Sequence, residues 1–201
     1  MAQTVCCPAP TALANIVTST IVCPTEFGQI RKLIFWRRGN ALDAVASAIS
    51  STVFTAYLSA TDDTKMVVSP YLTLVIPPSE KREAGSGSEV PNGIPISLGS
   101  NPVMGEGMIW QKAQSEIAAL KELGCEYLDV MFVNESNQLG YRLNGAAVEG
   151  FPIHSLFISD IGVGSFDEGT RNTISMYFEP NWSDGFRITE ATTFLLDSVN
   201  A

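Results

Sequence analysis

Nucleophilic catalysis in this chain would have to use His154, because it is the only histidine among the 201 residues. Ser-His-Asp and Cys-His sites need an imidazole base within hydrogen-bonding reach of the nucleophile. His154 follows a Gly-Phe-Pro turn at the entry to a predicted strand, and the sequence contains no G-x-S-x-G elbow. We therefore predict a satisfied strand-edge histidine, no catalytic residues and no enzyme. A small hydrolase that uses His154 is kept as an alternative.

Two pairs of glycines could form phosphate loops, but neither has the required surroundings. Gly105-Glu-Gly107 lacks a third glycine at the dinucleotide-binding spacing, and Glu106 would repel a phosphate. Gly162-Val-Gly164 is followed by its next glycine at the wrong spacing and does not enter a helix. The sequence therefore predicts no nucleotide cofactor.

The cysteines and carboxylates do not have metal-ligand spacing. The four cysteines form no C-x-x-C pair, and they are Cys6, Cys7, Cys23 and Cys125. The carboxylate pairs Asp62-Asp63 and Asp167-Glu168 both lie in predicted turns and lack the staggered oxygen ligands of a calcium loop. We predict no metal site and reduced thiols, with a disulfide through Cys6 or Cys7 as the alternative. The role of these two cysteines is left open.

Two Asn-x-Ser triplets, at Asn134 and Asn181, match the N-glycosylation pattern. The N-terminal segment has neither a basic region nor an uninterrupted apolar one, so we expect no secretory signal. No run approaches 18 apolar residues, so we expect no membrane partner. These features predict a chain made in a cytoplasm and not glycosylated.

The charge of the chain is low and unevenly distributed. Charged residues make up 16% of the sequence, against about 25% in typical globular proteins. Residues 1–40 hold four basic residues and one acidic residue, whereas the rest of the chain holds 8 basic and 20 acidic residues. Since nucleic-acid binding needs clustered Lys and Arg, this composition excludes specific DNA binding. This uneven distribution of charge suits head-to-tail contacts between copies of the chain. The alternative is that the charged residues are ordinary solvated surface residues.

Residues 29–37 predict a strand, because β-branched and aromatic types are dense there. Four cations flank its Leu-Ile-Phe-Trp centre, and they are Arg31, Lys32, Arg37 and Arg38. This pattern predicts a strand that is buried in its middle and charged at both ends. Stacking of nucleic acid on Trp36 is disfavoured by the acidic remainder of the chain.

The chain before and after that strand divides into an arm, helices and strands. Residues 1–26 contain three prolines and no periodicity, which predicts an extended N-terminal arm. Residues 41–60 have apolar positions at helical spacing, and a second short helix would be capped by Ser50 or Ser51 and run through Leu58. Strand segments are expected at 65–69 and 71–76.

Residues 77–107 form the most conspicuous loop region, with six glycines and five prolines. A loop of this length in a compact domain is usually functional. The Pro-Asn-Gly turn at 91–93 favours a protruding hairpin with residues 94–98 as its return strand, and a flexible surface loop is the alternative. We therefore expect a protrusion from a single domain that spans residues 27–201.

The clearest helix is predicted from Ile109 to Gly124, because its apolar residues recur at helical spacing and glycine ends it. Further strands are expected at 127–133, 138–143, 156–161, 173–178 and 194–199. Short turns between them predict antiparallel pairing. The fold class is therefore α+β: a mainly antiparallel sheet, sandwich or barrel with one prominent helix, one or two shorter helices and long loop and arm extensions.

The order of several segments resembles a known group of proteins. These segments are FGQIRKLIFWRR, TAYLSATDDTKMVVSPYLTLVIPP, EVPNGIPISLGSNP, CEYLDVMFVNE and SLFISDIGVGSFDEGTRNTISMYFEPNWSDGF. Together they are similar to structural proteins of Bacteroides-type tailed phages, including crAss-like ones, over roughly residues 22–195. The resemblance carries no catalytic residues with it.

What the resemblance implies is a virion subunit present in many copies: a tail tube, a tail or neck ring, or an auxiliary capsid protein. We expect a homo-oligomeric ring or tube that contacts other virion proteins and lets DNA pass without specific binding. The 1–26 arm and the 77–107 loop would add backbone hydrogen bonds at the sheet edges of neighbouring copies. The alternative is a carbohydrate- or receptor-binding virion module that uses an exposed Trp110 or Trp182.

Overall fold

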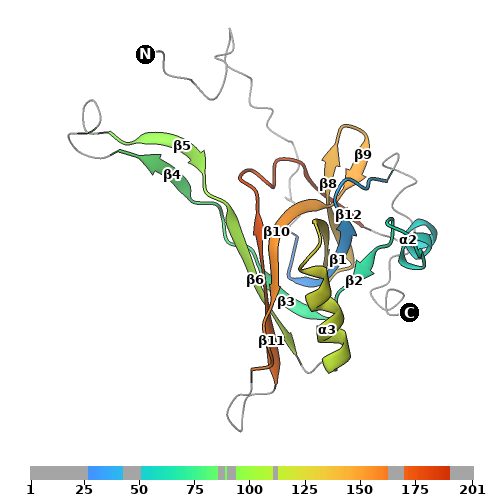
Figure 1. Ribbon diagram of the computed structural model, residues 1–201. Helices are drawn as coiled ribbons and strands as arrows, with labels where there is room; N and C mark the ends of the chain where they lie inside the picture. Colours follow the sequence, from blue (N-terminus) through green and yellow to red (C-terminus); the bar gives the residue numbers. More distant parts are fainter. Residues whose placement is uncertain are drawn as a thin grey trace.

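The computed structural model describes residues 27–42, 51–85, 89, 94–110, 113–162 and 170–190 (Figure 1). It is mostly antiparallel β-structure with two helices. The elements are β1 (Ile30–Arg37), α2 (Ser51–Leu58), β2 (Val67–Val68), β3 (Leu72–Val75), β4 (Lys81–Ala84), β5 (Ile96–Ser100), β6 (Val103–Trp110), α3 (Gln114–Leu123), β7 (Leu128–Asn134), β8 (Gln138–Asn144), β9 (Ala147–Glu149), β10 (Phe151–Ile158), β11 (Arg171–Phe178) and β12 (Phe186–Glu190).

Six strands close into a barrel. The main sheet has the order β12-β8-β7-β10-β11-β6-β3-β1-β2, and an additional pairing of β7 with β1 joins the two sides. The barrel strands are therefore β1, β7, β10, β11, β6 and β3, and every pair is antiparallel. The predicted α+β class with an antiparallel barrel is confirmed.

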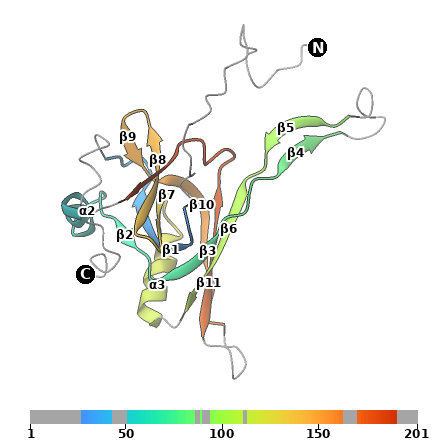
Figure 2. The same cartoon turned by 180° about the vertical axis from the view of Figure 1, so that it is seen from behind.

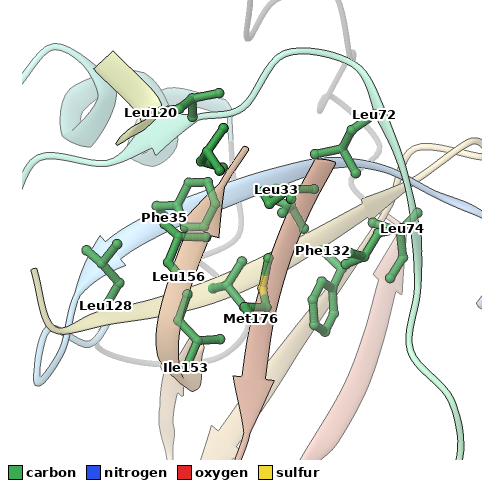
Figure 3. Packing of buried hydrophobic residues seen from close by; sticks show 14 of the residues in the cluster. Leu33, Phe35, Leu72, Leu74, Leu120, Leu128, Phe132, Ile153, Leu156 and Met176 are labelled. Atoms are coloured by element: carbon green, nitrogen blue, oxygen red, sulfur yellow. The ribbon is translucent and has the colours of Figure 1, made fainter. Parts of the chain in front are cut away.

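The interior of the barrel is filled by apolar side chains from alternate positions of its strands (Figure 3). On β1, Leu33 and Phe35 point into this interior, whereas Ile34 and Trp36 belong to a second cluster on the other side of the strand. That second cluster includes Phe54 of α2 and Leu139 of β8. Both faces of β1 are therefore buried, which explains its continuous apolar run.

An aromatic group covers part of the interior. Trp182, in the turn between β11 and β12, has its ring centroid 5.1–6.2 Å from those of Phe132, Phe151, Phe178 and Phe186. Most of these pairs are edge-on, the geometry that the aromatic quadrupole favours. The turn 179–185 is thus fixed on the barrel by its tryptophan.

The prominent helix is present, but it begins later than the sequence predicts. In α3 the backbone N–H of Ala113 donates to Glu116 Oε2 at 3.1 Å, and Gly124 ends the helix. Ile117 and Leu120 are buried and join the interior cluster. Ile109, which the spacing placed in the helix, lies instead in β6 with its side chain in the barrel, so that assignment is wrong.

The prediction of a loop through residue 107 is also wrong, because residues 103–107 form the first half of β6. Its inward positions include Gly105 and Gly107, where the interior leaves little room: a Cβ on Gly107 would lie 2.3 Å from the Thr73 carbonyl oxygen. Glycines that suggest a loop in the sequence are here required by close packing of strands.

Three strands in the second half of the chain differ from the prediction. β10 begins at Phe151 rather than at Leu156, and Pro152 lies within it, opposite Asp129. β9 and β12 were not predicted, because β9 is very short and β12 mixes polar with apolar residues. The expected helical segment at 43–50 and the expected strand at 194–199 lie outside the described residues, and the single-domain division remains a prediction.

Candidate functional site

The most prominent surface feature is a β-hairpin that projects from the barrel, visible in both views (Figures 1 and 2). β4 and β5 pair with each other in a two-stranded sheet separate from the main one. They continue the direction of β3 and β6, from which residues 76–80 and 101–102 connect to them. We call residues 81–100 the hairpin arm, of which 81–85, 89 and 94–100 are described.

The hairpin arm exposes apolar side chains. Ile94 is 69% exposed, and Ile96 and Leu98 are 45% and 47% exposed. Ala84 pairs with Ile96, so alternation along the strands puts Arg82 on the same face of the arm as Ile96 and Leu98. One face of the arm is therefore apolar with a single cation.

The opposite face of the hairpin arm and its base are polar. Lys81 and Glu83 form an ion pair on the opposite face. At the base, the Asn101 N–H donates to the Glu80 carbonyl at 2.8 Å, and Ser100 Oγ donates to Asn181 Oδ1 at 3.0 Å. The base is thus tied to the turn that carries Trp182, whereas the apolar face has no cover among the described residues.

His154 lies on the outside of β10, where its Nε2 is 2.9 Å from Glu179 Oε1. Both side chains are about half exposed. The hydrogen bond with His154 is the main cause that lowers the pKa of Glu179. Within the described part of the chain His154 has no hydrogen bond with a hydroxyl or thiol group. This geometry offers a hydrogen bond to a carboxylate and, among the described residues, no nucleophile.

Asp62, another residue weighed for chemistry, has a structural partner. Asp62 Oδ1 accepts hydrogen bonds from the N–H and hydroxyl of Thr64, which lower the pKa of Asp62 and close a turn. No three His, Cys, Asp or Glu side chains gather as metal ligands in the described ranges. Cys125 is a free, exposed thiol. Asp167, Glu168, Cys6, Cys7 and Cys23 lie outside those ranges.

Asn134, one of the glycosylation triplets, is fully buried. Its Oδ1 accepts from the backbone N–H groups of Ser136 and Gln138, and its Nδ2 donates to Gln138 Oε1 at 2.6 Å. The side chain therefore organises the β7–β8 turn, the function that Asn commonly has in turns.

The two tryptophans of the carbohydrate hypothesis differ in exposure. Trp182 is partly buried, because it packs into the aromatic group of the barrel. Trp110 is 42% exposed at the end of β6. The carbohydrate alternative would therefore have to use Trp110.

The basic run of β1 is paired within the chain. Arg37 makes a bidentate ion pair with Glu126, and Arg38 Nε lies 3.5 Å from Asp129 Oδ1. Lys32, expected at an exposed end of the strand, is instead buried, with its Nζ 4.4 Å from the centroid of the Tyr71 ring. The ammonium over an aromatic face explains how this cation is accommodated, and the prediction of its exposure is wrong.

Burial raises the pKa of Asp129, because the carboxylate loses more free energy of hydration than it gains from the attraction of the Arg38 guanidinium. When the pKa of a carboxyl is higher in the folded state than in the unfolded state, ionisation of that carboxyl lowers the stability of the protein. The loss is complete at pH values above the folded-state pKa and absent at pH values below the unfolded-state pKa. We therefore expect Asp129→Asn to be more stable than the wild type at pH 7, with the difference shrinking as the pH falls toward 3.8 and below. Urea unfolding of both proteins across this pH range measures the difference.

Asp160→Asn is the matched control, since Lys121 lowers the pKa of this exposed carboxyl. Its stability difference from the wild type should have the opposite sign at neutral pH and should also vanish in acid. If both variants differed from the wild type in stability by the same amount and with the same sign, the proposed destabilisation by buried Asp129 would be contradicted.

Neither helix is long and apolar enough to cross a membrane within the described part of the chain.

No protein-family model matches the chain, and no curated protein matches it. Two solved structures contain a chain to which this one is similar: a virion of a native gene transfer agent particle, and a tail of an empty particle of that kind with C6 symmetry. In both the identity is 14% and the TM-score 0.33, over 59% of this chain and 82% or 79% of the other. With this identity and this TM-score, the similarity does not decide the function of the chain.

Proposed function

We propose that the chain is a non-enzymatic structural subunit of a tailed-phage virion, which assembles with copies of itself into a ring or tube. The observation that carries the proposal is the hairpin arm, whose apolar face extends from the barrel without cover among the described residues. Tail tube, tail or neck ring, and auxiliary capsid protein are the components that suit it, with the tube or ring preferred.

The physical reason is the poor stability of an isolated hairpin. A two-stranded hairpin in water is at best marginally stable and needs a further apolar surface. Ile94, Ile96 and Leu98 would remain in water in a monomer. Burying each such side chain at a contact contributes about 1.5–3 kcal/mol. A neighbouring copy, present wherever the chain is abundant, can provide that surface.

The composition supports the same proposal. Low overall charge leaves surface for contacts between subunits, and the acidic body, with 8 basic and 20 acidic residues, offers few cationic groups that would hold DNA moving through a lumen. The N-terminal 1–26 arm would add further contacts to adjacent copies and to other virion proteins. Assembly would take place in the host cytoplasm.

The test is assembly of the purified full-length chain, followed by sedimentation velocity and negative-stain microscopy. We expect rings or tubes from the wild type. The double variant Ile96→Ser/Leu98→Ser should associate at least roughly 100-fold more weakly, because two apolar contacts are lost from every subunit interface. Circular dichroism should show an unchanged barrel, since both positions are exposed.

Tyr127→Ser is the control, because Tyr127 is the most exposed large apolar side chain among the described residues outside the hairpin arm. It should assemble as the wild type does. A wild-type chain that stays monomeric at high concentration would overturn the proposal, and so would full assembly of the double hairpin variant.

A further inference from the structure

We propose that the apolar face of the hairpin arm docks on the outer face of β3, β6, β11 and β10 of a second copy, with Arg82 of one copy paired with Glu106 of the next. This inference rests on the proposed self-assembly and names the surface that receives the hairpin arm.

Exposed apolar side chains gather on two surfaces of the described chain. One is the hairpin arm. The other, which we call the acceptor face, is the outward side of four adjacent barrel strands. Its large apolar residues are Tyr71, Val75, Met108, Trp110, Phe157 and Tyr177. Contiguous exposed apolar surface of this kind on a soluble protein marks an interaction site.

The strand register brings these side chains together. Val75 and Ser175 both lie opposite Glu106, and Phe157 lies opposite Ser175, so one row crosses all four strands. Thr73 and Thr173 lie opposite Met108 in the next row. Because alternate residues point the same way, the two rows form one outward surface. Val75 is 69% and Phe157 59% exposed, so nothing in the described chain covers them.

The acceptor face is hollowed at its centre. A groove of about 510 Å³ is lined by Val75, Glu106, Met108 and Phe157 together with Thr173 and Ser175. Gly107, which β6 needs for close packing inside the barrel, lies in the floor of this groove. Aliphatic side chains such as Ile96 and Leu98 suit a depression with this apolar lining.

The charges of the two surfaces are complementary. The acceptor face has one carboxylate at its centre, Glu106, and the apolar face of the hairpin arm has one cation, Arg82. Neither side chain has a hydrogen bond or ion pair with another described residue, unlike Lys81 and Glu83 on the opposite face of the arm. Each is therefore available to the other in a contact between copies, where complementary charges fix register.

The hairpin arm of one copy does not pack on the acceptor face of that same copy. It continues from β3 and β6 beyond the end of the barrel in both views and does not fold back over these strands (Figures 1 and 2). Closure of the barrel also removes the free edges of these strands, so a neighbour's arm must pack on the face rather than add a strand. A contact between two different surfaces of identical chains is head-to-tail, and its repetition gives rings or helical tubes.

Charge reversal tests the pairing in the full-length protein. We expect Arg82→Glu and Glu106→Arg each to weaken association roughly 100-fold, since each places like charges together at every contact. The double variant should assemble again, because the two exchanged charges are once more opposite in sign. A 1:1 mixture of the two single variants should also recover association, because a contact between the arm of one variant and the acceptor face of the other can again pair opposite charges. Sedimentation velocity measures each association, and circular dichroism checks the fold.

Lys81→Glu is the matched control on the opposite face of the hairpin arm and should assemble normally. If the wild type assembles but the double variant does not recover, the acceptor face is wrong and the proposed function stands. If the single reversals assemble normally, the acceptor face is again wrong. A wild type that never associates overturns the proposed function and this inference together.

Discussion

Phe132→Ala is expected to lower the free energy of unfolding by about 3–5 kcal/mol, the usual cost of removing a buried phenylalanine side chain. Phe132 is fully buried at the centre of the barrel core. Its ring lies 5.0–6.4 Å from those of Phe27, Phe151, Phe178 and Trp182. The substitution would leave a cavity that closed strands cannot collapse to fill. Urea unfolding monitored by the tryptophan fluorescence of the chain measures the loss.

The measurement is made in the Ile96→Ser/Leu98→Ser background, so that association does not add to the apparent stability. Tyr127→Ala provides the exposed aromatic control and should change stability by less than about 0.5 kcal/mol. A Phe132→Ala protein that unfolds at the urea concentration of its parent would refute the placement of this side chain in the core.

Gly107→Ala should destabilise the barrel by about 1–3 kcal/mol, the range seen when atoms are forced into a packed interior. The added Cβ would lie 2.3 Å from the backbone oxygen of Thr73 and 3.1 Å from Ile174 Cγ2. Backbone cannot rotate away as a side chain can, so β3 and β6 would have to separate. Thermal unfolding in the same background measures the effect.

Gly162→Ala is the control for this prediction. The nearest atom to its added Cβ would be the Arg171 carbonyl oxygen at 3.3 Å. The neighbouring backbone would therefore have to move much less than at Gly107. We expect its melting temperature to fall less than that of Gly107→Ala. The reverse order would contradict the close approach of β3 to β6.

Much of the fold could be predicted from the sequence because the relevant patterns are local. The apolar run of β1, the helical spacing before Gly124 and the strands expected at 127–133 and 173–178 all correspond to elements that are present. Short turns such as 134–137 predicted antiparallel neighbours, because two consecutive strands joined by a few residues can pair only in that way. Closure of the barrel needed the β1–β7 contact between distant segments, which no local pattern records.

The errors have the same origin. Gly105 and Gly107 suggest a loop when only neighbouring residues are considered, and they lie in a strand because a distant strand approaches too closely for a side chain. Lys32 is buried because Tyr71, far along the chain, offers its ring. The hairpin arm could be anticipated from its turn residues, but the acceptor face could not, since its members come from four strands spread over residues 71–177.

The sequence by itself determined most of the strands, the helix before Gly124 and the antiparallel class, since each depends on residue type and near spacing. Tertiary structure alone decided which apolar residues stay in water. Burial depends on which strands meet around the barrel, and so Val75 and Phe157 are exposed while Leu74 and Leu156 on the same strands are buried.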